Sequence, residues 1–246
     1  MTRTFRGKLD VLIVGAGPAG AVLSYLLSRK GIPVTLIERH HDFDREFRGE
    51  ILMPSGIEPF TQMGLEKQLN AVPHVNLDGV DFYANQKHLT TFAFNKELFG
   101  KYNPRWVSQP DLLEMLVGEC SQFRNFKLIR GTRVRQLIHD KNRVLGVIVD
   151  GDKRQEQLFA DIVIGTDGRK SRIRSSLGSS FRTDSMPMDI VWLKVPNIEP
   201  SSKLSIYVGG GKLLISAPTH DDNLQLGFVI KKGSFKDIRK QGPLSL

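Results

Sequence analysis

Cysteine is the residue type that this sequence has least of, since Cys120 is the only one among 246 residues. A single thiol cannot form a disulfide within the chain, and no Cys-x-x-Cys pair exists, so we exclude dithiol redox chemistry. Cys120 ends a mostly apolar stretch that begins at Leu112. We therefore expect it to be a small core residue rather than a reactive thiol.

Long apolar runs are also missing. No stretch of eighteen or more apolar residues occurs, so the sequence predicts no membrane-spanning helix. The apolar run at residues 11–14 is too short for the core of a signal peptide and is broken by Gly15, so we expect a cytoplasmic protein. The histidines show no metal-ligand spacing, and no metal site is predicted; they are His40, His41, His74, His88, His139 and His220.

Charge of one sign is in excess, with 35 basic against 26 acidic residues and a formal net charge of +9. The basic residues are spread along the chain and lack the interleaved aromatics of a single-strand nucleic-acid groove. We therefore predict no nucleic-acid partner and interpret the charge as solvated surface that attracts anionic dinucleotides.

The first forty residues have the pattern of a strand, a helix and a second strand. Residues 11–14 form a continuous apolar run, as expected for a parallel strand that is buried on both faces. Residues 19–29 then have apolar side chains at helical spacing, and Gly31 is placed to end that helix in a left-handed conformation. Residues 33–37 complete a βαβ unit.

Hydrophobic periodicity predicts further elements along the rest of the chain. We expect a hairpin at 80–83 and 89–94 that turns at Asn85-Gln86, and a helix at 171–177 capped by Ser171. The other predicted helices cover 55–62, 65–69, 109–120 and 234–240. The other predicted strands cover 126–129, 134–138, 144–149, 161–165, 190–195, 204–208, 213–217 and 224–230.

A phosphate-binding motif lies between the first strand and the first helix. Gly15-Ala16-Gly17-Pro18-Ala19-Gly20 is a G-x-G-x-x-G sequence, and its strand–turn–helix setting is the context that such a motif needs. Glu38 follows at about the 20-residue distance of the acid that binds ribose hydroxyls. Its carboxylate would repel a 2′-phosphate, so the bound adenosine is not that of NADP. The motif alone does not distinguish NAD from FAD.

Three further segments resemble the flavoprotein monooxygenases of the p-hydroxybenzoate hydroxylase type. The segment Arg48-Gly49-Glu50-Ile51-Leu52 matches one in which an arginine contacts the flavin's sugar-phosphate chain, so the resemblance assigns that role to Arg48. Ser108-Gln109-Pro110-Asp111-Leu112-Leu113 matches a helix start whose polar residue binds the ribityl or phosphate region, here Gln109.

The third and most specific segment runs from Asp161 to Arg174 and contains Thr166-Asp167-Gly168. In the family this turn supports the flavin pyrophosphate and the docking of NAD(P)H. Asp167 could accept a hydrogen bond from a flavin hydroxyl or orient neighbouring N–H groups, and Gly168 would permit close approach. The resemblance also assigns Arg39 and Val134 to the cofactor site.

The resemblance implies an FAD-dependent monooxygenase that uses NAD(P)H and O2 to hydroxylate or epoxidise a small organic substrate, aromatic or isoprenoid. It identifies no catalytic acid or base. Alternatives remain open: an isoprenoid reductase or a halogenase of the same fold, an NAD-dependent dehydrogenase, or a non-catalytic dinucleotide-binding remnant. Trp106 and Trp192 do not form the tryptophan-rich motif expected of the halogenase branch. The oligomeric state is left open.

The expected fold is α/β, with a Rossmann-like FAD-binding domain and an incomplete antiparallel β substrate-binding region. We assign residues 1–74 and 103–180 to the FAD-binding domain, with a β-meander at 134–149 that crosses one face. Residues 75–102 and 181–246 form the partial substrate-binding domain. The family's later Gly-Asp segment is not found here, so we expect a chain that is truncated before the C-terminal part of the flavin site.

Overall fold

The computed structural model describes residues 3–4, 7–44, 50–150, 155–178 and 181–241. The chain forms two compact units, each built from two stretches of sequence. Residues 1–45 and 109–181 form the first unit, and residues 46–108 and 182–246 form the second. The division therefore falls near residues 45 and 108 rather than at 74 and 102, while the ligand assigned to each unit stays a prediction.

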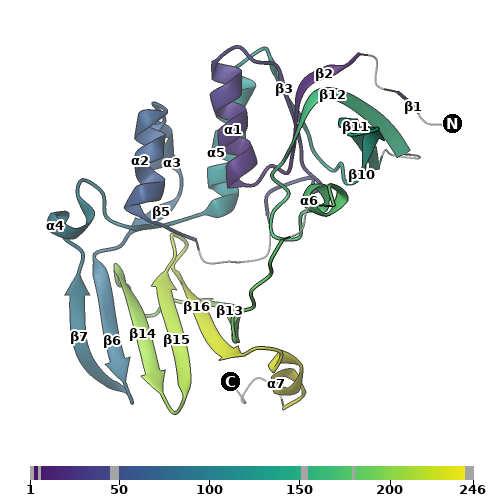
Figure 1. The fold of residues 1–246 in the computed structure, drawn as a ribbon. Coiled ribbons are helices and arrows are strands. Elements are labelled where there is room, and N and C mark those ends of the chain that lie inside the picture. The colour runs from purple at the N-terminus through teal and green to yellow at the C-terminus, as the bar shows by residue number, and fades with distance from the viewer. Residues whose placement is uncertain (1–2, 5–6, 45–49, 151–154, 179–180, 242–246) are drawn as a thin grey trace. The chain divides into compact units, whose positions relative to one another are not determined.

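The first unit is built on a parallel sheet that the first forty residues begin. Strands β2 (Leu9–Val14), β3 (Val34–Ile37) and β9 (Phe126–Ile129) pair in parallel, and β2 also pairs in parallel with the second half of β12 (Gln155–Gly165). The apolar runs of β2 and β3 are buried, and helices α1 (Pro18–Arg29) and α5 (Gln109–Ser121) pack together beside the sheet (Figure 1). Gly31 ends α1 with a φ of 80°, as predicted.

The predicted meander joins this sheet through β12. Strands β10 (Val134–Asp140) and β11 (Arg143–Asp150) are antiparallel, and β11 pairs with the first half of β12, which also carries the short β1 (Arg3–Thr4). Side chains from the meander and from the parallel strands share one hydrophobic core: Leu12, Val14, Ile37, Val134, Leu137, Val147, Val149, Leu158, Ala160 and Ile173. Helix α6 (Arg172–Ser176), whose residue Ile173 belongs to this core, follows β12.

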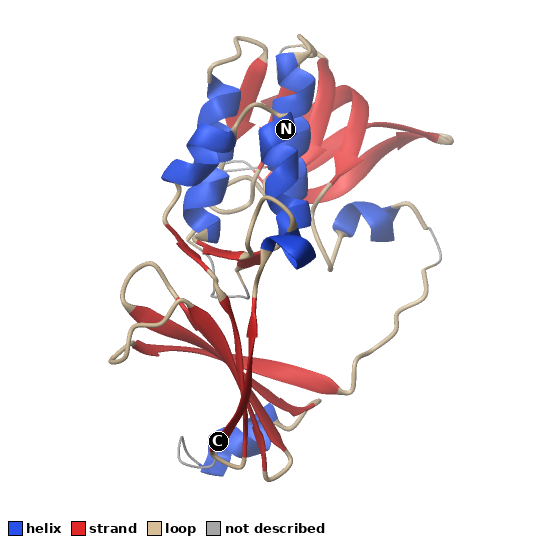
Figure 2. Cartoon of the chain, turned by 90° about the vertical axis from the view of Figure 1, so that its left-hand side faces the viewer, coloured by secondary structure: helices blue, strands red, loops and turns tan. Residues whose placement is uncertain are grey.

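The second unit contains a twisted sheet of six strands in the order β13-β16-β15-β14-β6-β7 (Figure 2). These strands are β6 (Gly79–Ala84), β7 (Lys87–Ala93), β13 (Met188–Pro196), β14 (Lys203–Gly209), β15 (Lys212–Pro218) and β16 (Asn223–Lys231). The predicted hairpin turn is confirmed, because Asn85 and Gln86 both have positive φ.

The sequence predicts an antiparallel region here, and all pairs of this sheet but one are antiparallel. Strand β14 runs parallel to β6, with Leu204 opposite Val80. A parallel pair requires a long crossover connection. Here the chain supplies one, since everything between β7 and β13 lies outside this sheet.

The remaining elements of the second unit are short. Helices α2 (Pro54–Gln62) and α3 (Glu66–Ala71) match the prediction. Helix α4 (Lys96–Phe99) follows β7 in sequence, and α7 (Phe235–Gln241) follows β16. A three-stranded sheet has β8 (Arg105–Val107) between β4 (Ile51–Leu52) and β5 (His74–Asn76). This small sheet was not predicted, because strands of two or three residues carry no measurable alternation.

Two features are absent from the part of the chain that the structure describes. No helix there is long and apolar enough to cross a membrane. No group of three or more His, Cys, Asp and Glu side chains comes together there in a way that could hold a metal ion.

Candidate functional site

The glycine turn between β2 and α1 is packed against a second, distant turn. Gly15 has a φ of 104°, and its N–H donates to the carbonyl of Ile37 at 2.8 Å. A Cβ at Gly15 would lie 2.7 Å from the Thr166 carbonyl oxygen, and one at Gly20 would lie 2.0 Å from the Gly15 carbonyl oxygen. Both positions therefore require glycine, for conformation at the first and for close approach at both.

Thr166 holds the two turns together. Its backbone N–H donates to the Val14 carbonyl at 2.9 Å, and its hydroxyl oxygen lies 2.9 Å from that carbonyl and 2.7 Å from the Gly15 carbonyl. The G-x-G and Asp-Gly motifs thus form one structure. They are joined through Val14 and Thr166, which are 152 residues apart in the sequence. Sequence reasoning identified both motifs but assigned no role to this threonine.

Asp167 organises the start of α6. One carboxylate oxygen accepts from the Ser171 hydroxyl at 2.5 Å, and the other accepts from the backbone N–H of Arg172 at 2.6 Å and of Ile173 at 3.3 Å. Ser171 in turn accepts from the Arg174 N–H at 3.0 Å, which is the predicted N-cap. Of the two roles considered for Asp167, the structure shows the orientation of N–H groups.

The N-terminus of α1 is open on the side where a dinucleotide phosphate would bind. No described atom lies within 4 Å of the position that a Cβ would occupy at Gly17, and the same holds for Gly168, whose φ is 82°. No side chain caps α1 at Gly17, and its first turn contains no acidic residue. The helix dipole and the free space therefore fit a pyrophosphate.

Glu38 is buried at the end of β3, with 3% of its surface exposed. One carboxylate oxygen accepts from the Ala16 N–H at 2.9 Å, and the other accepts from the His40 N–H at 3.2 Å. These bonds fix the carboxylate beside the glycine turn. The neighbouring Arg39 is exposed, with its Nε 2.9 Å from the Nε2 of His40.

An ion pair that the sequence did not indicate braces the segment after Glu38. The Arg130 guanidinium makes two hydrogen bonds to the Glu114 carboxylate, at 2.7 and 2.6 Å, and these bonds raise the pKa of Arg130. Arg130 also lies over the ring of Phe43, 4.6 Å from its centroid. Arg130 follows β9, Glu114 lies in α5, and Phe43 lies in the segment after Glu38. Arg130 therefore connects three parts of the first unit through these two contacts.

The other predicted contacts have different settings. Gln109 is the first residue of α5 and is half-buried. Val134 begins β10, and its side chain packs in the core, which leaves its backbone as the part that a ligand can contact. Arg48 lies outside the described residues. Just after it, the Glu50 carbonyl accepts from the Val107 N–H at 2.9 Å, so the segments next to Arg48 and Gln109 are paired.

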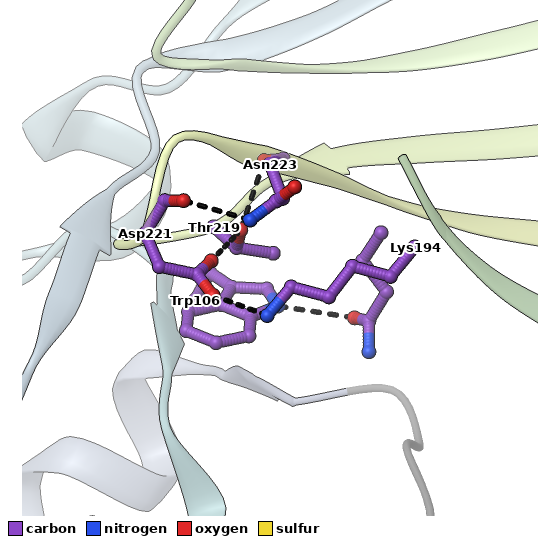
Figure 3. A network of polar contacts seen from close by, with 6 residues as sticks. Trp106, Lys194, Thr219, Asp221 and Asn223 are labelled. Atoms are coloured by element: carbon purple, nitrogen blue, oxygen red, sulfur yellow. Dashed lines mark hydrogen bonds and ion pairs between the residues drawn. The ribbon is translucent and has the colours of Figure 1, made fainter. Parts of the chain in front are cut away.

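A polar network occupies the second unit, at the connection from β15 to β16 (Figure 3). Trp106 in β8 donates its Nε1–H to the Gln225 side-chain oxygen at 3.0 Å, and its ring stacks on His220 with 5.4 Å between ring centroids. Trp106 and Gln225 are 3% and 2% exposed. No sequence pattern indicated this group, because Trp106 and Gln225 are 119 residues apart in the sequence.

The connection itself is held by Asp221. Its carboxylate pairs with Lys194 and accepts from the Thr219 hydroxyl at 2.6 Å, while its carbonyl accepts from the Asn223 amide at 2.7 Å. Burial alone would raise the pKa of the Asp221 carboxyl, but the hydrogen bonds from Lys194, Thr219 and Asn223 outweigh it and hold that pKa well below its usual range. The residues between β15 and β16 are therefore fixed rather than loose.

Comparison with known proteins places this geometry in a family. Residues 8–227 match the family described as FAD binding domain. The 6-methylpretetramide 4-monooxygenase of Streptomyces rimosus is 30% identical over 236 residues, which are 95% of this chain and 56% of that protein. Squalene epoxidase 4 of Arabidopsis thaliana is 32% identical over 173 residues, which are 70% of this chain and 33% of that protein.

A solved structure shows the same fold at lower identity. The p-nitrophenol 4-monooxygenase PnpA from Pseudomonas putida DLL-E4 aligns with a TM-score of 0.83 at 16% identity, covering all of this chain and 62% of that one. The chain spans about half or less of the length of the curated relatives reported above. Because the family match includes the glycine turn, Glu38 and the Thr166-Asp167-Gly168 turn, the chain belongs to the FAD binding domain family.

Proposed function

We propose that the chain binds FAD, with the pyrophosphate at the N-terminus of α1. One observation carries this proposal: the glycine turn at Gly15 is packed against the turn at Asp167. Thr166 donates a hydrogen bond to the Gly15 carbonyl, while the space beside Gly17 stays open. Glu38, already held by Ala16, would accept hydrogen bonds from the ribose hydroxyls. The proposal keeps the other contacts with FAD that the sequence predicts: Arg39, Arg48, Gln109, Val134 and Gly168.

We further propose that the whole protein is a monooxygenase. Two curated relatives are named a monooxygenase and an epoxidase, and a p-nitrophenol monooxygenase has the same fold. Bound FAD would supply the transfer of two electrons from NAD(P)H to O2. One oxygen atom would enter the substrate, which supplies the other two electrons, and the second atom would leave as water. The reaction would consume NAD(P)H and one proton and release NAD(P)+.

The residues of this chain would bind and orient rather than transfer protons. The α1 N-terminus and the Asp167 turn would hold the cofactor's charged centre. Arg169 lies in the turn itself, and α6 carries Arg172 and Arg174 beside it. These cations favour an anionic nicotinamide nucleotide. No catalytic acid or base is assigned. The relatives' names favour a small aromatic or isoprenoid substrate, and we keep the cytoplasmic location as a prediction.

Oxygen uptake tests this function. The purified protein, loaded with FAD, would be supplied with NADH or NADPH and a panel of phenols and isoprenoids. A monooxygenase will consume O2 in a substrate-dependent way and place one atom from labelled O2 in the product. Reduction of an isoprenoid without O2 uptake would identify a reductase instead, and a halide-dependent product would identify a halogenase.

A further inference from the structure

The peptide unit between Gly15 and Ala16 is held at both of its polar atoms. Its carbonyl oxygen, which belongs to Gly15, lies 2.7 Å from the Thr166 hydroxyl oxygen. Its N–H, which belongs to Ala16, donates to a Glu38 carboxylate oxygen at 2.9 Å. This one peptide therefore connects the residue directly after β12 with the residue directly after β3.

The Thr166 hydroxyl has one proton to donate, and two carbonyls lie near it, that of Gly15 at 2.7 Å and that of Val14 at 2.9 Å. The Val14 carbonyl already accepts from the Thr166 backbone N–H at 2.9 Å, and the Gly15 carbonyl is the nearer of the two. We therefore assign the proton to Gly15. The hydroxyl, the peptide and the Glu38 carboxylate then form a continuous chain of hydrogen bonds, in which each bond polarises the next.

Both ends of this chain are fixed in place. A Cβ at Gly20 would lie 2.7 Å from the Thr166 hydroxyl oxygen, so the start of α1 leaves that hydroxyl little room to move. Glu38 is 3% exposed, and its second carboxylate oxygen accepts from the His40 N–H at 3.2 Å. A rotation of the peptide would therefore disturb the carboxylate, because the Ala16 N–H helps to hold it.

We propose that Thr166 is a positioning residue for the ribose of the adenosine. Its hydroxyl fixes the peptide after Gly15, and this peptide in turn fixes the direction from which the Glu38 carboxylate meets the ribose hydroxyls. The inference rests on the proposed binding of FAD. It gives Thr166 no contact with the cofactor. Its consequence is that the threonine sets how well the site recognises the 2′-hydroxyl group.

Two variants that differ from each other by one oxygen atom test this. Thr166→Ser keeps the hydroxyl, and Thr166→Ala removes it without placing a methyl group against two carbonyl oxygens, as valine would. Ser24→Ala is the matched control, because the buried Ser24 hydroxyl donates to the Gly20 carbonyl at 2.7 Å within the same helix. Urea unfolding of each variant shows that it is folded before binding is compared.

The readout is the displacement of FAD from the loaded protein by ADP and by 2′-deoxy-ADP, followed by flavin fluorescence. The unaltered protein should favour ADP over 2′-deoxy-ADP at least about tenfold, the usual effect of one hydrogen bond to a charged group. Thr166→Ala should reduce that preference at least about threefold, as expected when one supporting hydrogen bond is lost. Thr166→Ser and Ser24→Ala should keep the preference.

Three results would overturn the inference. An unchanged preference in Thr166→Ala would do so, because a threonine that only stabilises the turn would weaken both nucleotides equally. A lost preference in Thr166→Ser, which keeps the hydroxyl, would do so however well Thr166→Ala folds. An equal loss in Ser24→Ala would point to a general loosening of α1. Failure of the proposed function gives a different result, because the unaltered protein would then bind neither FAD nor ADP, and the inference would fall with it.

Discussion

At the scale of single residues, the glycines of the first turn differ in the space that surrounds them. A Cβ at Gly20 would lie 2.0 Å from the Gly15 carbonyl oxygen, whereas no described atom lies within 4 Å of one at Gly17. The backbone at Gly17 has a φ of −70°, which alanine adopts freely. One position is therefore closed by the protein, and the other is open to a ligand.

This contrast predicts opposite behaviour for two alanine variants. Gly20→Ala should lower the free energy of unfolding by about 1–3 kcal/mol, because the methyl overpacks against backbone. Gly17→Ala should keep the unfolding free energy within about 0.5 kcal/mol but weaken FAD binding at least about tenfold, because its methyl fills the approach of the pyrophosphate. Urea unfolding and flavin titration measure the two effects. Equal FAD affinity in Gly17→Ala and the unaltered protein would place the pyrophosphate elsewhere.

Cys120 gives a second test at this scale. It is fully buried in α5, and burial raises the pKa of its thiol to about 12. The folded state holds this proton more tightly than the unfolded chain, so the stabilisation is complete below about pH 9 and is lost as the pH rises toward 12. A thiol reagent at pH 8 should therefore label Cys120 in urea but not in buffer. Rapid labelling of the folded protein would contradict this burial.

At the scale of elements, α6 depends on its cap more than on its length. The helix has five residues, too few to be stable alone, and its first N–H groups are satisfied by Asp167 and Ser171. The cap is therefore what fixes the turn that packs on Gly15.

Removal of the cap hydroxyl should be measurable. Ser171→Ala should cost about 1 kcal/mol of unfolding free energy, typical of a lost N-cap, and should also weaken FAD binding through the loosened Asp167 turn. Ser175→Ala is the matched control, because the Ser175 hydroxyl donates only to the carbonyl one turn earlier, at 2.9 Å. If both variants unfold alike and bind FAD alike, the cap does not support the site.

Elements with clear periodicity could be predicted from the sequence, and others could not. The apolar runs of β2 and β3 match their burial, and the four late strands lie where their apolar patterns predict them. In α1 the apolar pattern predicts the helix but not its buried face, because Leu26 is 43% exposed while Ala21 and Ser24 are buried. The first half of β12 was missed, because residues 155–157 are polar and pair at the antiparallel side of the sheet. Strands β4 and β8 were missed because each is short and their pairing joins distant residues, such as Ile51 and Trp106.

At the scale of the whole molecule, sequence motifs identified the turns but not what joins them. The Gly15 and Asp167 motifs could be predicted because each has its own local pattern. Three contacts could not be predicted, because each depends on a fold that brings distant residues together. They are the Thr166 bond to Gly15, the Arg130–Glu114 pair and the Trp106–Gln225 bond.

The identity of the bound cofactor tests the central claim most directly. Purified protein would be heat-denatured, and the released flavin would be separated and quantified by chromatography. The pyrophosphate site at Gly17 and the ribose site at Glu38 predict about one FAD per chain and no FMN, because FMN has neither the pyrophosphate nor the adenosine that these residues would bind. FMN in place of FAD, or a protein that takes up NADH but no flavin, would contradict the account.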